Sequence, residues 1–323
     1  MKILLLTLTA LLVLTSCAGK KYFEPEDTQS YDGEVRSIDD DIQTFNRSGA
    51  TLKNSYYLSN SGVSKNALPE GFEFLNQVND TVIATNNKDK ILLNDEIIEL
   101  NDVVVAASIE NNNLALIFSN NTIAIYNTLE KKIVFKEYYK ESIANDIRIT
   151  NPLFMNNLIL FPTLDGKVIV VSKEEKKAVK TIVVDPDSTF NNIIFLSVLN
   201  DTLIAATNNK IIAVGTGSLN IKDYEIREIT TSDTHIYVGT IDGRLIKLDV
   251  TLNELASKKY KFAKFYALAF SDALYALESQ GFLIKVDEDF IKDVVYDFSF
   301  PQDAKVITIG NKIYFEDNYL TFK

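Results

Sequence analysis

The chain of 323 residues contains no tryptophan, one cysteine, one histidine and two methionines. Transition-metal sites usually bring several cysteine or histidine side chains together, and so do many catalytic sites. A chain this poor in those residues is badly supplied for such chemistry. The sequence therefore predicts no catalytic residue, no bound metal and no cofactor, and it favours a binding role over an enzyme.

Positive charge is also scarce relative to negative charge. The chain has 33 lysines and arginines against 44 aspartates and glutamates, a formal net charge of −11, and a pI of about 4.8. Nucleic acids and anionic membrane surfaces repel such a body, so neither is an expected partner of the folded part. Hydrophobic residues make up 46% of the chain, which is enough for one large all-β domain or two smaller ones.

An apolar run occupies the N-terminus. Lys2 is followed by the stretch from Ile3 to Leu14, which is too short to span a bilayer comfortably and is placed as an export signal. We therefore assign residues 1–16 to a signal peptide and exclude them from the fold.

The residues Leu14-Thr15-Ser16-Cys17 resemble the lipobox of bacterial lipoproteins. The resemblance implies that Cys17 receives a diacylglyceryl group, that the signal is cut before it, and that its new amino group takes an acyl chain such as palmitate. Cys17 has no possible disulfide partner in the chain, and lipidation accounts for an otherwise unusual free thiol. The alternative is an ordinary signal peptide with an incidental cysteine. Because Ala18 stands where an aspartate would signal inner-membrane retention, the resemblance favours the outer membrane.

Residues 17–45 are rich in acidic and turn-forming residues and poor in aliphatic ones, which is typical of a flexible tether. The run Asp39-Asp40-Asp41 lacks the alternating ligands, glycine and distal glutamate of an EF-hand loop. We interpret it as a solvated charge run and expect the folded domain over residues 46–323.

The rest of the chain is a repeat of about 40 residues, in which a polar turn, an apolar strand, a tight turn and another apolar strand recur. Its seven clear copies begin at Asn79, Asn111, Met155, Asn200, Ser232, Ser271 and Gly310. Each copy has a hairpin signal at its centre: Asn86-Asn87, Asn120-Asn121, Asp165-Gly166, Asn208-Asn209, Asp242-Gly243, Gln280-Gly281 and Asp317-Asn318. Such residues tolerate the positive φ angles of a type I′ turn, so we expect type I′ hairpins.

Two further apolar stretches between copies give each unit four strands, and helical periodicity is almost absent. A four-stranded antiparallel unit of about 40 residues is a β-propeller blade. A fainter copy begins at Lys53, so we predict eight blades, with seven as the alternative. The last unit lacks a fourth strand, and we expect Glu34 to Ile42, or nearby residues, to supply it and close the ring.

Two segments, "DGKVIVVS" (Asp165 to Ser172) and "DGRLIKLD" (Asp242 to Asp249), resemble the hairpins of PQQ-type propeller repeats. The resemblance extends over about residues 50 to 323, although the family's Thr-Gly pair and the tryptophan after the third strand are missing. PQQ-dependent dehydrogenases stack their cofactor on a tryptophan and commonly use a vicinal disulfide, which this chain cannot form. They are a remote alternative.

A lipobox joined to one such propeller resembles the BamB-like lipoproteins, which support the assembly of β-barrel proteins in the outer membrane. The resemblance implies a non-catalytic scaffold that is anchored through Cys17, faces the periplasm and acts as a monomer within the barrel-assembly machinery. It implies no small-molecule substrate. The alternative is a surface-exposed or periplasmic binding or adhesion lipoprotein.

Several further features are expected to be structural rather than functional. His235 occupies a turn next to a strand, and Phe262 to Phe270 form the innermost strand of a blade. The basic stretches Leu129 to Lys136 and Lys173 to Lys180 are loops after third strands, which we interpret as solvated turns rather than docking sites for acidic partners. The pairs Tyr56-Tyr57 and Tyr138-Tyr139 are expected to pack between blades, with a recognition surface as the alternative.

Overall fold

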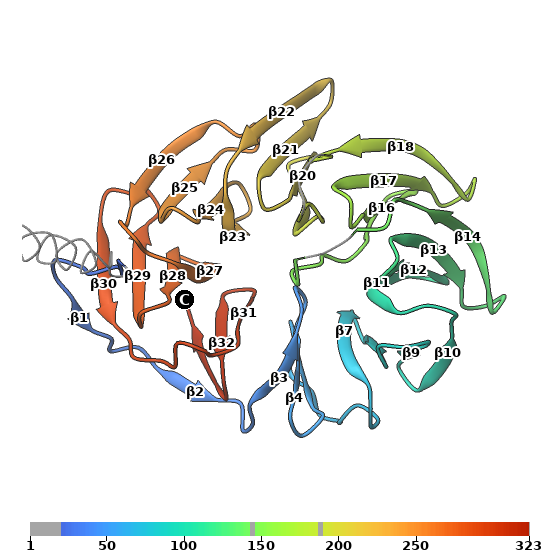
Figure 1. The fold of residues 1–323 in the computed structure, drawn as a ribbon, viewed down its shortest axis with the longest axis horizontal. Helices are drawn as coiled ribbons and strands as arrows, with labels where there is room; N and C mark the ends of the chain where they lie inside the picture. Colours follow the sequence, from blue (N-terminus) through green and yellow to red (C-terminus); the bar gives the residue numbers. More distant parts are fainter. Residues whose placement is uncertain (1–20, 143–145, 187–189, 323) are drawn as a thin grey trace, which may run out of the picture.

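The computed structural model describes residues 21–142, 146–186 and 190–322. Within them the chain forms 33 strands and no helix. Eight sheets, each containing a four-stranded antiparallel unit, are arranged as blades around a central axis (Figure 1). This confirms the all-β propeller of eight four-stranded antiparallel blades and excludes the seven-bladed alternative.

The first four blades follow one another along the chain. From the axis outward, their strands are β3 (Ile42–Phe45), β4 (Ala50–Leu52), β5 (Tyr57–Ser59) and β6 (Gly62–Val63) in blade 1; β7 (Glu73–Val78), β8 (Thr81–Thr85), β9 (Lys90–Leu93) and β10 (Glu96–Glu99) in blade 2; β11 (Val104–Glu110), β12 (Asn113–Phe118), β13 (Thr122–Asn127) and β14 (Lys132–Tyr138) in blade 3; and β15 (Leu153–Met155), β16 (Leu158–Pro162), β17 (Lys167–Ser172) and β18 (Lys177–Val183) in blade 4.

The remaining blades continue in the same order, and two of them gain a strand from the N-terminal segment. Their strands are β19 (Phe195–Leu199), β20 (Thr202–Ala206), β21 (Lys210–Gly215) and β22 (Ser218–Asp223) in blade 5; β23 (Ile226–Thr231), β24 (Ile236–Thr240), β25 (Arg244–Leu248) and β26 (Glu254–Lys259) in blade 6; β27 (Phe265–Phe270), β28 (Ala273–Glu278), β29 (Phe282–Asp287), β30 (Asp293–Asp297) and β1 (Gln29–Ser30) in blade 7; and β31 (Val306–Ile309), β32 (Lys312–Phe315), β33 (Asn318–Thr321) and β2 (Val35–Ser37) in blade 8.

Burial along each blade explains why the repeat appears as short apolar runs. Neighbouring blades cover both faces of the second and third strands, so a strand such as β12 is buried from Leu114 to Phe118. Both faces then select apolar residues, and alternation disappears. The outer strand β18 is mostly exposed, with only Ala178 and Ile182 half-buried, because its blade edge faces solvent. The core is therefore a ring of inter-blade clusters around the axis.

The ring closes through the N-terminal segment, as predicted. β2 pairs antiparallel with β33, and Val35 lies opposite Leu320 while Ser37 lies opposite Asn318. The next residues continue this contact, since the Ile38 amide donates to the Asp317 carbonyl at 2.8 Å. The last blade thus gains its fourth strand from within the predicted range.

The predicted tether is described from Lys21 onward, and several of its residues contact the propeller. Phe23 is only 7% exposed and packs edge-on against Tyr260 and Phe282, with ring centroids 6.0 and 5.6 Å away. β1 then runs parallel to β30. The inner strand of blade 1, β3, begins at Ile42, before the expected domain boundary at residue 46.

The hairpins lie where the sequence predicts them, but their turns are not of type I′. At five of the seven pairs only the second residue has a positive φ angle, namely Asn87, Asn121, Gly166, Gly243 and Gly281. Most of the connections are longer than two residues, since β12 ends at Phe118 and β13 begins at Thr122. Longer hairpin loops commonly place a type I turn before a single left-handed residue, and that requires one tolerant position rather than two.

Candidate functional site

Cys17, the predicted lipidation site, lies outside the described residues. Within the described part of the chain, no helix is long and apolar enough to cross a membrane, and no group of three or more His, Cys, Asp or Glu side chains is placed to hold a metal ion. His235 directly precedes β24, in the turn where the sequence places it, and its Nδ1 lies 2.9 Å from Thr234 Oγ1. Burial, together with the positive charge of Lys247, lowers the pKa of His235.

The two basic stretches form the connections between the third and fourth strands of blades 3 and 4, and part of the outer strands. One lysine of each stretch is paired with an acidic residue of the preceding blade: Lys131 Nζ lies 2.8 Å from Glu96 Oε1, and Lys173 pairs with Glu110. These contacts reduce the positive charge that the loops present. They favour the interpretation as solvated turns.

The aromatic features divide between core and surface. Tyr57 stacks on Phe74, with centroids 5.1 Å apart, and so packs between blades 1 and 2 as expected. Tyr138, by contrast, is 70% exposed on the outer strand β14. Phe265 to Phe270 form β27, the innermost strand of blade 7, as predicted.

A cavity near the propeller axis brings together five charged residues, of which four are half-buried and Arg227 is exposed. Three separate segments supply its charged residues: Arg47 from the β3–β4 turn, Asp146 and Arg148 from the β14–β15 connection, and Arg227 and Glu228 from β23. We call it the arginine cavity and define it by these five residues together with Phe45, Ile147, Tyr266, Val306 and Thr308.

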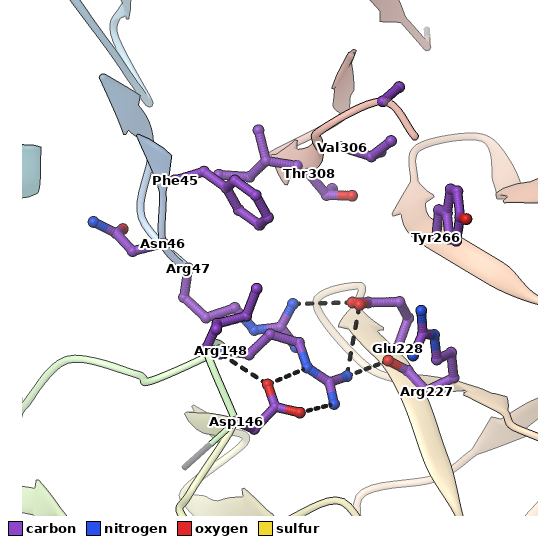
Figure 2. A pocket seen from close by; sticks show the side chains of 13 residues that line it. Phe45, Asn46, Arg47, Asp146, Arg148, Arg227, Glu228, Tyr266, Val306 and Thr308 are labelled. Carbon is purple, nitrogen blue, oxygen red and sulfur yellow. Dashed lines mark hydrogen bonds and ion pairs between the residues drawn. The ribbon is translucent and has the colours of Figure 1, made fainter. Parts of the chain in front are cut away.

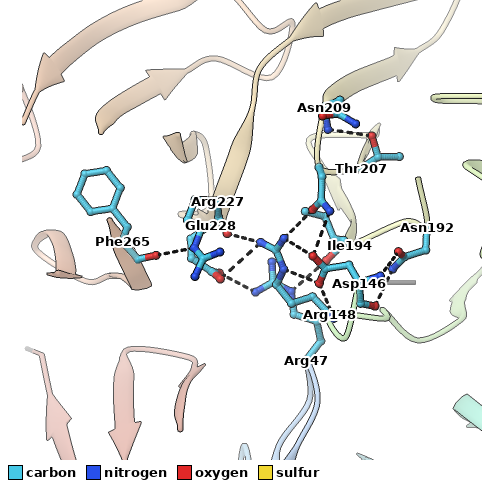
Figure 3. Close-up of polar contacts among 11 residues, drawn as sticks. Arg47, Asp146, Arg148, Asn192, Ile194, Thr207, Asn209, Arg227, Glu228 and Phe265 are labelled. Atoms are coloured by element: carbon cyan, nitrogen blue, oxygen red, sulfur yellow. Dashed lines mark hydrogen bonds and ion pairs between the residues drawn. The ribbon is translucent and has the colours of Figure 1, made fainter. Parts of the chain in front are cut away.

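Four of the five charged side chains of the arginine cavity, those other than Arg227, form one connected network (Figure 3). Arg47 donates through Nη1 to Glu228 Oε2 at 3.0 Å and through Nε to the Ile194 carbonyl at 3.0 Å. Arg148 holds both oxygens of Asp146, with Nε–Oδ1 at 2.8 Å and Nη2–Oδ2 at 2.6 Å. Arg148 Nη1 also lies 3.6 Å from Glu228 Oε1, so Glu228 joins the two arginines.

Neighbouring amides and charges hold Asp146 in place and keep its side chain ionised. Asn192 accepts from the Asp146 amide at 2.7 Å, and Asn208 Nδ2 donates to Asp146 Oδ2 at 3.1 Å. Burial alone would raise the pKa of Asp146, but the hydrogen bonds and charge of Arg148 outweigh it and lower the pKa to about 2. Burial also opposes the charge of Arg148, yet Asp146 and Glu228 raise its pKa. Both groups are therefore charged at neutral pH.

The opposite wall of the cavity is largely apolar. Figure 2 shows Phe45 and Val306 across an open space from the arginines, with Tyr266 at one end. The cavity has a volume of about 250 Å³, smaller than the roughly 300–1,000 Å³ typical of pockets for drug-sized ligands. It is suited to a small molecule or to a single side chain.

A second hollow of about 920 Å³ adjoins the arginine cavity along the axis, and Arg47 and Thr308 line both. Its other polar residues include Asn76, Ser108, Asn151, Thr230 and Asn311. Several of these side chains form hydrogen bonds with backbone groups; for example, Asn76 Nδ2 donates to the Ala107 carbonyl at 2.8 Å. The hollow is therefore a polar opening at the centre of the ring.

The amino-acid composition contains one hint of the arginine cavity, but not enough to predict it. The chain has five arginines, at positions 36, 47, 148, 227 and 244, and three of them line this one cavity. No lysine lines it, although lysine is by far the commoner cation in the chain. Sequence spacing cannot show that residues separated by 101 and 79 positions meet, but the scarcity of arginine marks them as unusual.

No known protein-family model matches the chain. Among curated proteins, it is similar to the plasminogen-binding protein PgbB from two strains of Helicobacter pylori, 26695 and J99, at 27% identity in each case. Both alignments cover 98% of this chain and 67% of the relative.

Among solved structures, the chain is similar to BamB from Moraxella catarrhalis, with a TM-score of 0.69 at 13% identity over 92% of this chain and all of BamB. It is also similar to the C-terminal WD40 domain of Sif2, with a TM-score of 0.64 at 12% identity over 91% of this chain and all of that domain. The TM-scores show that the chain shares the propeller fold with these proteins, and at such low identity the similarity shows the fold alone. Because propellers with unrelated functions share it, the fold alone does not assign a function.

Proposed function

We propose that this chain is a lipid-anchored, non-catalytic binding protein of the bacterial cell surface, and that its propeller binds a protein ligand, with plasminogen as the first candidate. The observation that carries the proposal is the 27% identity to plasminogen-binding protein PgbB over 98% of the chain. That similarity includes the whole propeller, so the shared part is the domain able to present a binding surface.

The test uses intact cells that make the protein, a deletion strain, and the deletion strain complemented with the wild type or with Cys17→Ala. Flow cytometry with labelled plasminogen measures binding. We expect the deletion to reduce plasminogen binding to the cells and the wild type to restore it. Cys17→Ala should not restore it, because the protein is no longer anchored. Equal binding by wild-type and deletion cells, together with no binding of the purified protein to immobilised plasminogen, would show that the proposal is wrong.

A BamB-like role in outer-membrane protein assembly is the second candidate. It is supported by the structural similarity to BamB, which extends over the full length of that protein, but the identity of 13% carries the fold alone. Protease added to intact cells separates the two proposals. Digestion of the propeller supports surface exposure, whereas protection, with co-purification of the barrel-assembly machinery, supports the BamB-like role.

A further inference from the structure

We propose that the arginine cavity is a binding site for a carboxylate group attached to a short apolar body. The inference concerns a small cavity near the axis and does not depend on which protein the propeller binds. It rests on the charge balance of the cavity, on its polar groups without partners, and on its apolar wall.

The charge balance leaves one cation available. Three arginines meet two carboxylates, and both carboxylates are already engaged: Asp146 by Arg148, and Glu228 by Arg47 at 3.0 Å. Arg227 is solvent-exposed and donates only through Nε, to the Phe265 carbonyl at 3.4 Å; within the described residues its two Nη atoms have no hydrogen-bond partner, so its charge is free to meet an anion at the cavity mouth. A local excess of one positive charge in a chain of net charge −11 is a feature that an anion would complement.

Two buried polar atoms at the same cavity lack partners as well. Arg47 Nη2 and Thr308 Oγ1 are buried and make no hydrogen bond within the part of the chain that the structure describes. A buried guanidinium donor left unsatisfied is costly and calls for an explanation. These two buried atoms indicate a cavity whose hydrogen bonding is completed by something other than the protein, and exposed Arg227 stands beside them with free donors.

The use of arginine narrows the class of anion. A guanidinium presents a planar fork of donors that matches a carboxylate in two parallel hydrogen bonds, whereas lysine acts as a point charge. Phosphate shares the fork geometry, but the facing wall of Phe45, Tyr266 and Val306 offers it little. Ile147, 66% exposed, extends the apolar surface at the cavity. A carboxylate with an aliphatic body can pair with the arginines through its charge and pack its body against the apolar wall.

A carboxylate of this kind has two sources: a free short-chain carboxylic acid, or the C-terminus of a peptide that ends in an apolar residue. The test is isothermal titration calorimetry on the full chain in lipid nanodiscs, with empty nanodiscs as the baseline. The probes are hexanoate, its neutral counterpart hexanamide, inorganic phosphate, and the tripeptide N-acetyl-Ala-Ala-Leu as its free acid and as its amide.

We expect at least one of the two acids to bind, its amide to bind at least roughly tenfold more weakly, and phosphate to bind more weakly than the acid. Arg227→Gln should weaken the binding of the acid at least roughly tenfold, because it removes the free guanidinium. Arg244→Gln is the matched control, since it removes a half-exposed arginine outside the cavity, and should leave affinity unchanged. Preferential binding of the tripeptide acid identifies a peptide terminus as the source, and preferential binding of hexanoate a free acid.

Arg227→Lys keeps the positive charge without the fork, and its intermediate affinity would support the proposal if Arg227→Gln lowers the thermal midpoint. The proposal is wrong if neither acid binds, if an amide binds as well as its acid, or if phosphate binds more tightly than both acids. It is also wrong if well-folded Arg227→Gln retains the affinity of the wild type.

Discussion

Asp146 is the residue at which charge and stability are most directly coupled. Its pKa of about 2 lies below the ordinary 3.8, so the fold favours the ionised form. This contribution is fully present above about pH 4 and is lost as the pH falls towards 2. We predict that Asp146→Asn lowers the free energy of unfolding at neutral pH by about 1–2 kcal/mol, allowing for solvent screening, and that the difference shrinks below about pH 3. Urea unfolding across this pH range measures it.

The control for this prediction is Asp95→Asn, because Asp95 is exposed in the turn between β9 and β10. Its substitution should change the stability by less than about 0.5 kcal/mol at any pH. A pH-independent loss for Asp146→Asn would mean that the side chain acts by packing or neutral hydrogen bonding, and not through its charge.

Gly243 tests the backbone conformation of a predicted hairpin. Its φ angle is 85°, and a Cβ built on it would lie 2.2 Å from the Tyr260 carbonyl oxygen. Gly217 has a similar φ of 76° but nothing within 4 Å of its Cβ position. Gly217→Ala should therefore cost only the left-handed strain of about 1–2 kcal/mol, whereas Gly243→Ala should cost at least about 1 kcal/mol more. Equal losses in urea unfolding would show that the β24–β25 turn can move away from its neighbour.

At the level of elements, the seam between β2 and β33 decides whether the ring is closed. Removal of residues through Ser37 leaves the backbone edge of β33 unpaired, and an open edge both loses hydrogen bonds and invites association with other chains. We predict a lower thermal midpoint and faster aggregation than for the full chain. Calorimetry and light scattering measure the two effects.

A shorter truncation separates closure from the other contacts of the same segment. Removal through Asp32 deletes Phe23 and β1 but keeps β2 paired with β33. It should lower the thermal midpoint without promoting aggregation. If both truncations aggregate equally fast, the contacts of Phe23 and β1 prevent aggregation, and the pairing of β2 with β33 does not.

Most strands and their grouping into blades could be predicted from the sequence because each blade repeats the same local pattern. Apolar runs buried on both faces and turn pairs at matching positions predicted the blade order, the eight blades and the donated strand β2. The turn type was wrong because residues such as Asn120 and Asn121 have compatible preferences in several turns, and loop length decides among them. β1 was not expected, since Gln29–Ser30 is too short and too exposed to carry an apolar pattern.

The arginine cavity could not be predicted because it depends on how the ring closes. Arg47, Arg148 and Arg227 lie on blades 1, 3–4 and 6, and only the circular arrangement brings them together near the axis. The local sequence around each arginine is typical of an ordinary turn or inner strand. Sequence patterns identify which strands form a blade, but contacts between side chains of distant blades depend on the curvature and tilt of the whole ring.

On the scale of the whole molecule, the N-terminal segment determines which side of the propeller would face a membrane. Cys17 precedes Phe23 by six residues, and an extended chain spans at most about 3.6 Å per residue. A lipid on Cys17 therefore lies within about 20 Å of Phe23, which packs against blades 6 and 7 through Tyr260 and Phe282. Blade 3 lies on the other side of the ring (Figure 1).

We predict that lipidated protein in vesicles holds Lys261 closer to the bilayer than Leu129. Lys261 is exposed beside Tyr260, and Leu129 is 77% exposed in the β13–β14 loop of blade 3. Because Cys17 would carry the lipid, Lys261→Cys and Leu129→Cys each introduce a single free thiol for a fluorophore. Lipid-embedded nitroxide should quench the fluorophore at position 261 more strongly, and Cys17→Ala should abolish quenching at both positions. Equal quenching at the two positions would mean that the contacts of Phe23 do not orient the propeller on the membrane.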